Sequence, residues 1–121
     1  MVQRLLVVDD EADFGSFVRK VAEDAGFEVR VLEDASMFKQ AYQQFMPQKI
    51  VLDVVMPGMD GIEIMRWLAS VGNRASVILV SGYPPNYAKA AKLMAEAHAD
   101  AKVTVLTKPT SVTDLTRALT T

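Results

Sequence analysis

Five side chains that can do chemistry stand where short apolar runs of the sequence end. They are the neighbouring acids Asp9 and Asp10, a single acid, Asp53, a hydroxyl, Ser81, and a lysine, Lys108. The runs before them are too short for helices and rich in β-branched residues, which is typical of buried strands. An ionised carboxylate at the end of a buried strand needs a partner, a metal or a function. Taken singly, each residue has an ordinary explanation as a helix cap, a turn residue or a solvated side chain.

Together, these residue types predict a site for phosphoryl transfer. Three carboxylates in one place repel one another and require protonation or a hard cation. Oxygen ligands without histidine or cysteine favour Mg²⁺. A lysine and a hydroxyl supply a positive charge and a hydrogen bond, which suit the positioning and charge neutralisation that phosphoryl transfer needs. Asp53 is the candidate nucleophile, because it ends the central apolar run and its carboxylate can form an acyl phosphate.

The elements that must position these residues follow from the hydrophobic pattern, which alternates strand and helix five times. Strands are predicted at residues 4–8, 27–32, 50–52, 77–80 and 103–106, and helices at residues 12–25, 36–46, 62–69, 87–97 and 112–119. This alternation implies an α/β fold, a doubly wound parallel sheet with right-handed crossovers.

For a chain of 121 residues, the flavodoxin-like (βα)5 arrangement with strand order 2-1-3-4-5 is expected. The second strand alternates apolar and polar residues, which indicates an edge of the sheet. Because ligands of such folds bind beyond the carboxyl ends of the strands, between the first and the third, the five side chains are expected to meet in that crevice.

Length and composition argue against several classes of function. Residues 1–121 are expected to form a single domain, and no apolar run approaches the roughly 20 residues of a membrane span. The net charge is −2 without a basic cluster, which argues against direct nucleic-acid binding. The chain has no cysteine, which excludes disulfides and thiolate chemistry and fits a cytoplasmic protein.

The motifs resemble those of the response-regulator receiver domain (CheY-like) of bacterial two-component signalling. The resemblance covers essentially the whole chain and is carried by LLVVDDE at residues 5–11, LDVVMPGMDG at residues 52–61, Ser81-Gly82 and Lys108-Pro109. It implies that residues 1–121 are a phosphoacceptor domain and that any output domain lies outside this chain.

The resemblance also implies a role for each residue of the site. Asp53 would accept a phosphoryl group from the phosphohistidine of a sensor histidine kinase or phosphotransfer protein, in a phosphorelay. The chain would act as an acceptor with at most slow self-dephosphorylation rather than as an enzyme. Mg²⁺ would be bound by Asp10 directly, by Asp9 through water, by Asp53 and by the backbone carbonyl of Val55.

Ser81 and Lys108 would contact the phosphoryl group from two sides, and the Lys108–Pro109 peptide bond would be cis. Phosphorylation would then alter the face built from the fourth strand, the following helix and the fifth strand, and thereby control an output domain or a downstream protein.

Two positions depart from the family pattern. Val105 stands where receivers usually carry an aromatic residue of the switch. We therefore expect Tyr83, two residues after Ser81, or a shift of the following loop, to carry the signal. Val55 and Tyr83 occupy the positions that tune hydrolysis in the family, and neither positions water, which predicts a long-lived phosphorylated form.

Three other interpretations remain open from the sequence. A degenerate receiver would keep the fold as a phosphorylation-independent interaction module, although all five site residues are present. A phosphatase of the haloacid dehalogenase type would carry its nucleophile after the first strand, followed two residues later by a second acid. Here Asp53 follows the third strand, and Val55 stands at the position of the second acid. A flavodoxin would carry a phosphate loop rich in Ser and Thr after the first strand.

Overall fold

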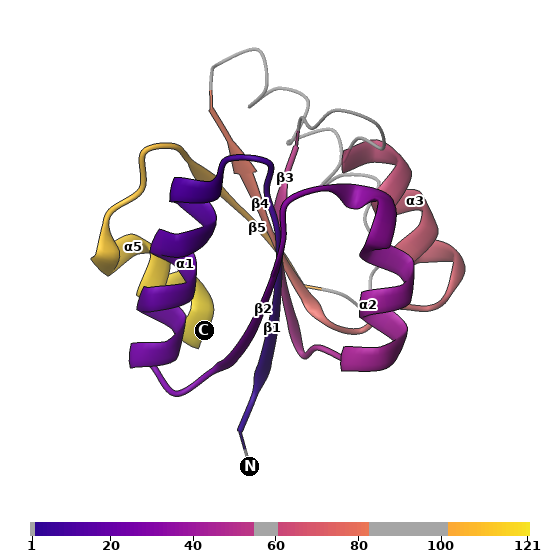
Figure 1. The fold of residues 1–121 in the computed structure, drawn as a ribbon, viewed down its shortest axis with the longest axis horizontal. Coiled ribbons are helices and arrows are strands. Elements are labelled where there is room, and N and C mark those ends of the chain that lie inside the picture. Colours follow the sequence, from indigo (N-terminus) through magenta and orange to yellow (C-terminus); the bar gives the residue numbers. More distant parts are fainter. Residues whose placement is uncertain (1, 55–60, 83–101) are drawn as a thin grey trace.

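The computed structural model describes residues 2–54, 61–82 and 102–121 (Figure 1). Their five strands form one parallel sheet in the order β2-β1-β3-β4-β5. The predicted flavodoxin-like fold and strand order are therefore confirmed. The strands are Arg4–Val8 (β1), Glu28–Leu32 (β2), Lys49–Asp53 (β3), Ser76–Ser81 (β4) and Val103–Thr107 (β5).

Helices cover both faces of the sheet. Figure 1 shows α1 and α5 together on one side and α2 and α3 on the other. The helices are Ala12–Asp24 (α1), Phe38–Phe45 (α2), Gly61–Ser70 (α3) and Val112–Thr120 (α5), with a 3-10 turn at Ala35–Met37 (η1) before α2. The helix predicted at residues 87–97 lies outside the described residues. Among the helices that the structure describes, none is long and apolar enough to cross a membrane.

The core has two halves, one on each side of the sheet. Successive residues of a strand point to opposite faces, so Leu5 and Val7 pack on the α1 and α5 side, whereas Leu6 and Val8 pack on the α2 and α3 side. Because β1 is covered on both faces, its sequence is a continuous apolar run rather than an alternating one. This double cover holds the end of β1 rigidly where the candidate site begins.

The second helix begins and ends differently from the prediction. The chain becomes helical at η1, where the Asp34 carboxylate accepts a hydrogen bond from the Ser36 backbone N–H at 2.8 Å. At the other end, α2 stops at Phe45, and Met46 takes a left-handed conformation with φ 52°. Pro47 disfavours the right-handed helical conformation for the residue before it, so the helix ends ahead of the proline. The last helix is capped at its N-terminus, because Ser111 Oγ accepts from the Asp114 N–H at 3.0 Å.

A buried lysine lies at the other end of the central strand. Lys49, the first residue of β3, is only 7% exposed. Its ammonium group donates a hydrogen bond to the Thr121 carbonyl oxygen at 3.2 Å. Lys49 thereby caps the carboxyl end of α5, where a positive charge is favourable. Burial lowers its pKa, and the charge of Lys102 lowers it further.

Candidate functional site

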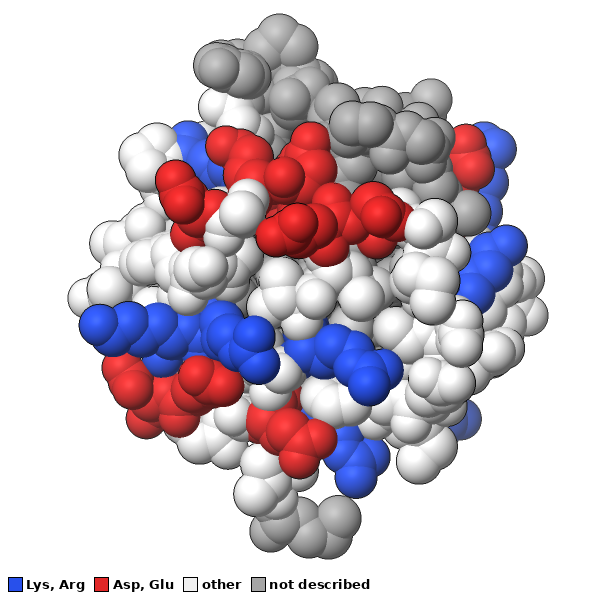
Figure 2. All heavy atoms as spheres, in the orientation of Figure 1, with Lys and Arg blue, Asp and Glu red and all other residues white. Residues whose placement is uncertain are grey.

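The sheet brings the predicted side chains to one edge. Asp9 follows β1, Asp53 is the last residue of β3, Ser81 is the last residue of β4 and Lys108 follows β5. One carboxylate oxygen from each of Asp9, Asp10 and Asp53 can be chosen so that all three lie within 4.8 Å of one another. Figure 2 shows acidic side chains gathered toward the end of the molecule where these strands end, with Lys and Arg side chains mostly further down the same face.

Asp9 is the most buried member of the cluster. Its Oδ1 accepts a hydrogen bond from the Glu11 backbone N–H at 2.8 Å, and its Oδ2 lies 2.9 Å from Lys108 Nζ. This contact is an ion pair without hydrogen-bond alignment, and Oδ2 has no hydrogen-bond partner among the described residues. Burial raises the pKa of Asp9, and the Glu11 N–H and the Lys108 ammonium lower it only in part. Burial thus opposes ionisation of Asp9 by more than the Glu11 N–H and the single Lys108 charge favour it.

Asp53 occupies the centre of this edge. Its neighbours on the sheet fix the backbone: Asp53 is in register with Val80 of β4, and the following Val54 N–H donates to the Val80 carbonyl at 3.0 Å. The residue is 7% exposed, and its Oδ2 lies 3.5 Å from Lys108 Nζ. Asp10, by contrast, is exposed at the mouth of the site. The cluster thus runs from a buried floor to an open rim.

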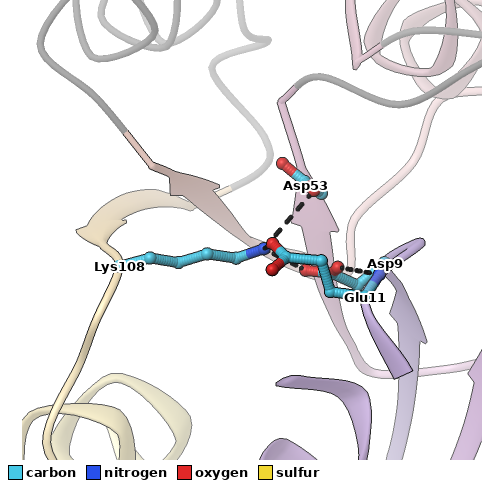
Figure 3. A network of polar contacts seen from close by, with 4 residues as sticks. All are labelled: Asp9, Glu11, Asp53 and Lys108. Atoms are coloured by element: carbon cyan, nitrogen blue, oxygen red, sulfur yellow. Dashed lines mark hydrogen bonds and ion pairs between the residues drawn. The ribbon is translucent and has the colours of Figure 1, made fainter. Parts of the chain in front are cut away.

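Lys108 reaches across the edge of the sheet to three carboxylates (Figure 3). Its Nζ lies 2.5 Å from Glu11 Oε1, 2.9 Å from Asp9 Oδ2 and 3.5 Å from Asp53 Oδ2. The ammonium also stands 4.5 Å from the centre of the Phe14 ring, in a cation–π contact. Burial lowers the pKa of Lys108, but the hydrogen bond to Glu11 and the charges of Asp9 and Asp53 outweigh burial and raise it above its ordinary value. The lysine is therefore positively charged at neutral pH.

The remaining predicted residues are placed as follows. Ser81 is fully buried at the end of β4, and its carbonyl oxygen accepts from the Lys108 backbone N–H at 2.8 Å. The Lys108–Pro109 peptide bond is cis. Val105 is half-buried in β5 and packs against the core on the α2 and α3 side. Val55 and Tyr83 lie outside the described residues.

Sequence reasoning missed two contacts of Lys108. In the sequence, Glu11 belongs to the motif LLVVDDE and Phe14 to the helix predicted at residues 12–25, and neither assignment by itself indicates a contact with Lys108. Glu11 stands at the N-cap position of α1, yet its side chain makes no capping hydrogen bond, which leaves the carboxylate free to meet Lys108. One feature of the sequence could have indicated the Phe14 contact. Phe14 lies in the first turn of α1, shortly after the acids that follow β1, which places its ring near the edge of the sheet where Lys108 lies.

The acid cluster fits a hard divalent cation. Its donors are carboxylate oxygens alone, which is the ligand type that Mg²⁺ prefers. Asp9 supplies a buried oxygen without a hydrogen bond among the described residues, and Asp10 keeps the rim open to water. These three acids could therefore hold a metal ion.

Comparison with known proteins gives a family for the chain. Residues 5–120 match the family model described as the response regulator receiver domain. The response regulator receiver protein CpdR of Brucella abortus (strain 2308) is 30% identical over 114 residues, which make up 94% of this chain and 91% of that protein. The DNA-binding response regulator MtrA of Mycobacterium tuberculosis (strain ATCC 25618 / H37Rv) is 33% identical over 81 residues, 67% of this chain. That match spans only 36% of MtrA, so the chain corresponds to about a third of that longer protein.

Solved structures agree with the sequence matches. The signal receiver domain from Bermanella marisrubri superposes with a TM-score of 0.84 at 26% identity, over 98% of this chain and 96% of that one. The receiver domain of NtrX from Brucella abortus superposes with a TM-score of 0.83 at 27% identity, over 97% and 98% of the two chains. The family match over residues 5–120 favours the receiver over the phosphatase and flavodoxin interpretations. The chain belongs to the family of response-regulator receiver domains.

Proposed function

We propose that this chain is a phosphoacceptor in a two-component signalling pathway, with Asp53 as the acceptor. The observation that carries the proposal is the position of Asp53, a nearly buried carboxylate 3.5 Å from the Lys108 ammonium and clustered with two further acids. The donor is the phosphohistidine of a sensor histidine kinase or phosphotransfer protein. Receiver domains are in general phosphoryl acceptors rather than enzymes, and we assign this chain at most a slow self-dephosphorylation.

The transfer exchanges one bond to phosphorus for another. An oxygen of the Asp53 carboxylate attacks the phosphorus, the P–N bond to the donor imidazole breaks, and its electron pair remains on the imidazole nitrogen. The protein contributes position and charge rather than covalent chemistry. Lys108 offers its positive charge to the phosphoryl oxygens, and Ser81, at the end of the neighbouring strand, offers a hydroxyl for a hydrogen bond.

The acids set the metal requirement. Asp10 would bind Mg²⁺ directly, Asp9 would bind it through water, and Asp53 and the Val55 backbone carbonyl would complete the protein ligands. Bound there, the ion supplies positive charge that offsets the charge of the transferring phosphoryl group. Without the ion, the three acids keep the site negative, which opposes the approach of an anionic donor.

Phosphorylation then acts as a switch. The added charge attracts the Ser81 hydroxyl, and the population shifts between two packings of the face that includes β4 and β5. Because Val105 cannot take the part of an aromatic switch residue, Tyr83 or the loop after it carries the change to an output domain or a downstream protein. Residues 1–121 form the receiver, and an output domain, where one exists, lies outside them.

A small donor with a P–N bond tests this function directly. The protein is incubated with phosphoramidate and Mg²⁺, and its intact mass is followed over time. We expect the mass to rise by one phosphoryl group, no rise in Asp53→Asn, and a much slower rise when the metal is chelated. An unlabelled wild type with bound metal would instead identify a degenerate receiver, an interaction module that works without phosphorylation.

A further inference from the structure

Lys108 is held mainly by the segment that joins β1 to α1, not by the proposed phosphoacceptor. Glu11, Asp9 and Phe14 all come from this segment, and their contacts with Nζ are 2.5 Å, 2.9 Å and, to the ring centre, 4.5 Å. Asp53 is the most distant of the three carboxylates, at 3.5 Å. Figure 3 shows the Lys108 side chain extended toward Glu11 and Asp9, with Asp53 to one side.

The two short contacts differ in how easily they can open. Asp9 is fully buried and fixed by the Glu11 N–H. The Glu11 side chain is 65% exposed and makes no capping hydrogen bond in α1. Rotation of Glu11 into water breaks its ion pair without leaving a buried polar group. The Glu11 contact is therefore the one that can be released.

A phosphoryl group on Asp53 would compete with Glu11 for the Lys108 ammonium. Lys108 Nζ is shared between Glu11 at 2.5 Å and Asp53 at 3.5 Å, so a strong contact with Glu11 weakens the contact that Nζ can make with a phosphoryl oxygen on Asp53. We propose that Glu11 is a positioning residue that holds the Lys108 ammonium in an ion pair, draws it away from Asp53 and so slows phosphoryl acceptance. This inference rests on the proposed function of Asp53.

Removal of the Glu11 charge therefore releases the lysine. Glu11→Gln keeps the shape of the side chain and abolishes the strong ion pair. We expect its rate of labelling by phosphoramidate with Mg²⁺ to rise roughly two- to fivefold, the range that corresponds to a partly exposed ion pair. Glu11→Asp is one methylene shorter but still charged, so its labelling rate should lie between those of the wild type and Glu11→Gln.

Two further variants separate the effect of the Glu11–Lys108 ion pair from that of a general change in charge. Glu33→Gln removes an exposed acid that follows β2 and is not one of the three carboxylates that pair with Lys108, so its rate should stay near that of the wild type. Phe14→Leu changes no charge but removes the ring beneath Nζ, so its rate should rise, by less than in Glu11→Gln. In a Lys108→Met background, Glu11→Gln should have no more effect than Glu33→Gln.

A measurement on the unphosphorylated protein completes the test. Urea denaturation of the wild type, Glu11→Gln, Lys108→Met and the double variant gives the coupling between the two side chains. We expect each single change to lower the midpoint by more when the other partner is present.

The outcomes separate this inference from the function on which it rests. If the wild type takes up label, two results count against the inference: Glu11→Gln is labelled no faster than Glu33→Gln, or the denaturation cycle shows no coupling between Glu11 and Lys108. Either result overturns the positioning role of Glu11 and leaves the proposed phosphoacceptor intact. A wild type that takes up no label overturns both.

Discussion

Replacement of Asp53 by Asn should stabilise the metal-free protein. The three acids have oxygens within 4.8 Å of one another, and at that separation two unit charges repel by about 0.9 kcal/mol in water and about 3.5 kcal/mol at an effective dielectric constant of about 20. Asp53 feels two such repulsions, against one attraction to Lys108 at 3.5 Å.

The balance is a net repulsion of about 0.5–2 kcal/mol, which Asp53→Asn removes while keeping the size of the side chain. For a domain of this size, that gain corresponds to a rise in Tm of roughly 2–8 °C.

Mg²⁺ should make the wild type more stable than Asp53→Asn, the reverse of their order in the absence of metal. At a hundredfold excess over its Kd, a ligand of the native state stabilises by about 2.7 kcal/mol. The wild type gains this fully, whereas Asp53→Asn keeps only two of the three carboxylates and gains less.

Thermal unfolding of both proteins in chelator and in Mg²⁺ gives the four midpoints, with Glu33→Gln as a matched loss of one charge outside the cluster. Four equal midpoints, or an Asn variant less stable than the wild type in chelator, would refute the electrostatic reasoning.

Three further predictions concern lifetime, pH and capping. The phosphoryl group on Asp53 should be lost slowly after the donor is removed, and rapid unassisted loss in an intact-mass time course would contradict this. Lys49 has a folded pKa lowered first by burial and then by Lys102, so stability should rise as the pH rises through that value toward the unfolded value of about 10.4. Urea midpoints from neutral pH to pH of about 10 should show this rise in the wild type and not in Lys49→Met. Ser111→Ala should cost about 1 kcal/mol, since the Asp114 N–H loses its acceptor, and an unchanged urea midpoint would count against that cap.

The fold followed from the sequence because its pattern is local and repeated. Each buried strand is a short apolar run, and β2 alternates because it is an edge strand with Glu28 and Arg30 exposed. The meeting of Asp9, Asp53 and Lys108 followed in turn, since the ends of parallel strands must share one edge of the sheet.

The contacts that sequence reasoning missed depend on distances that no local pattern encodes. Lys108 has several carboxylates within reach, and only the folded structure shows that Glu11 and Asp9 lie closer to its Nζ than Asp53 does. Lys49 shows the same limit. A lysine at the start of a strand is ordinarily solvated, and its burial depends on the carboxyl end of α5, which lies 72 residues further along the chain.

The measurement that tests the central claim most directly is the location of the phosphoryl label. The protein is treated with acetyl phosphate and Mg²⁺, reduced with borohydride to convert any acyl phosphate to an alcohol, digested and sequenced by mass spectrometry. We predict that homoserine replaces aspartate at Asp53 and that Asp9 and Asp10 remain unchanged. Protein that binds the metal but carries no modification at Asp53 would contradict it.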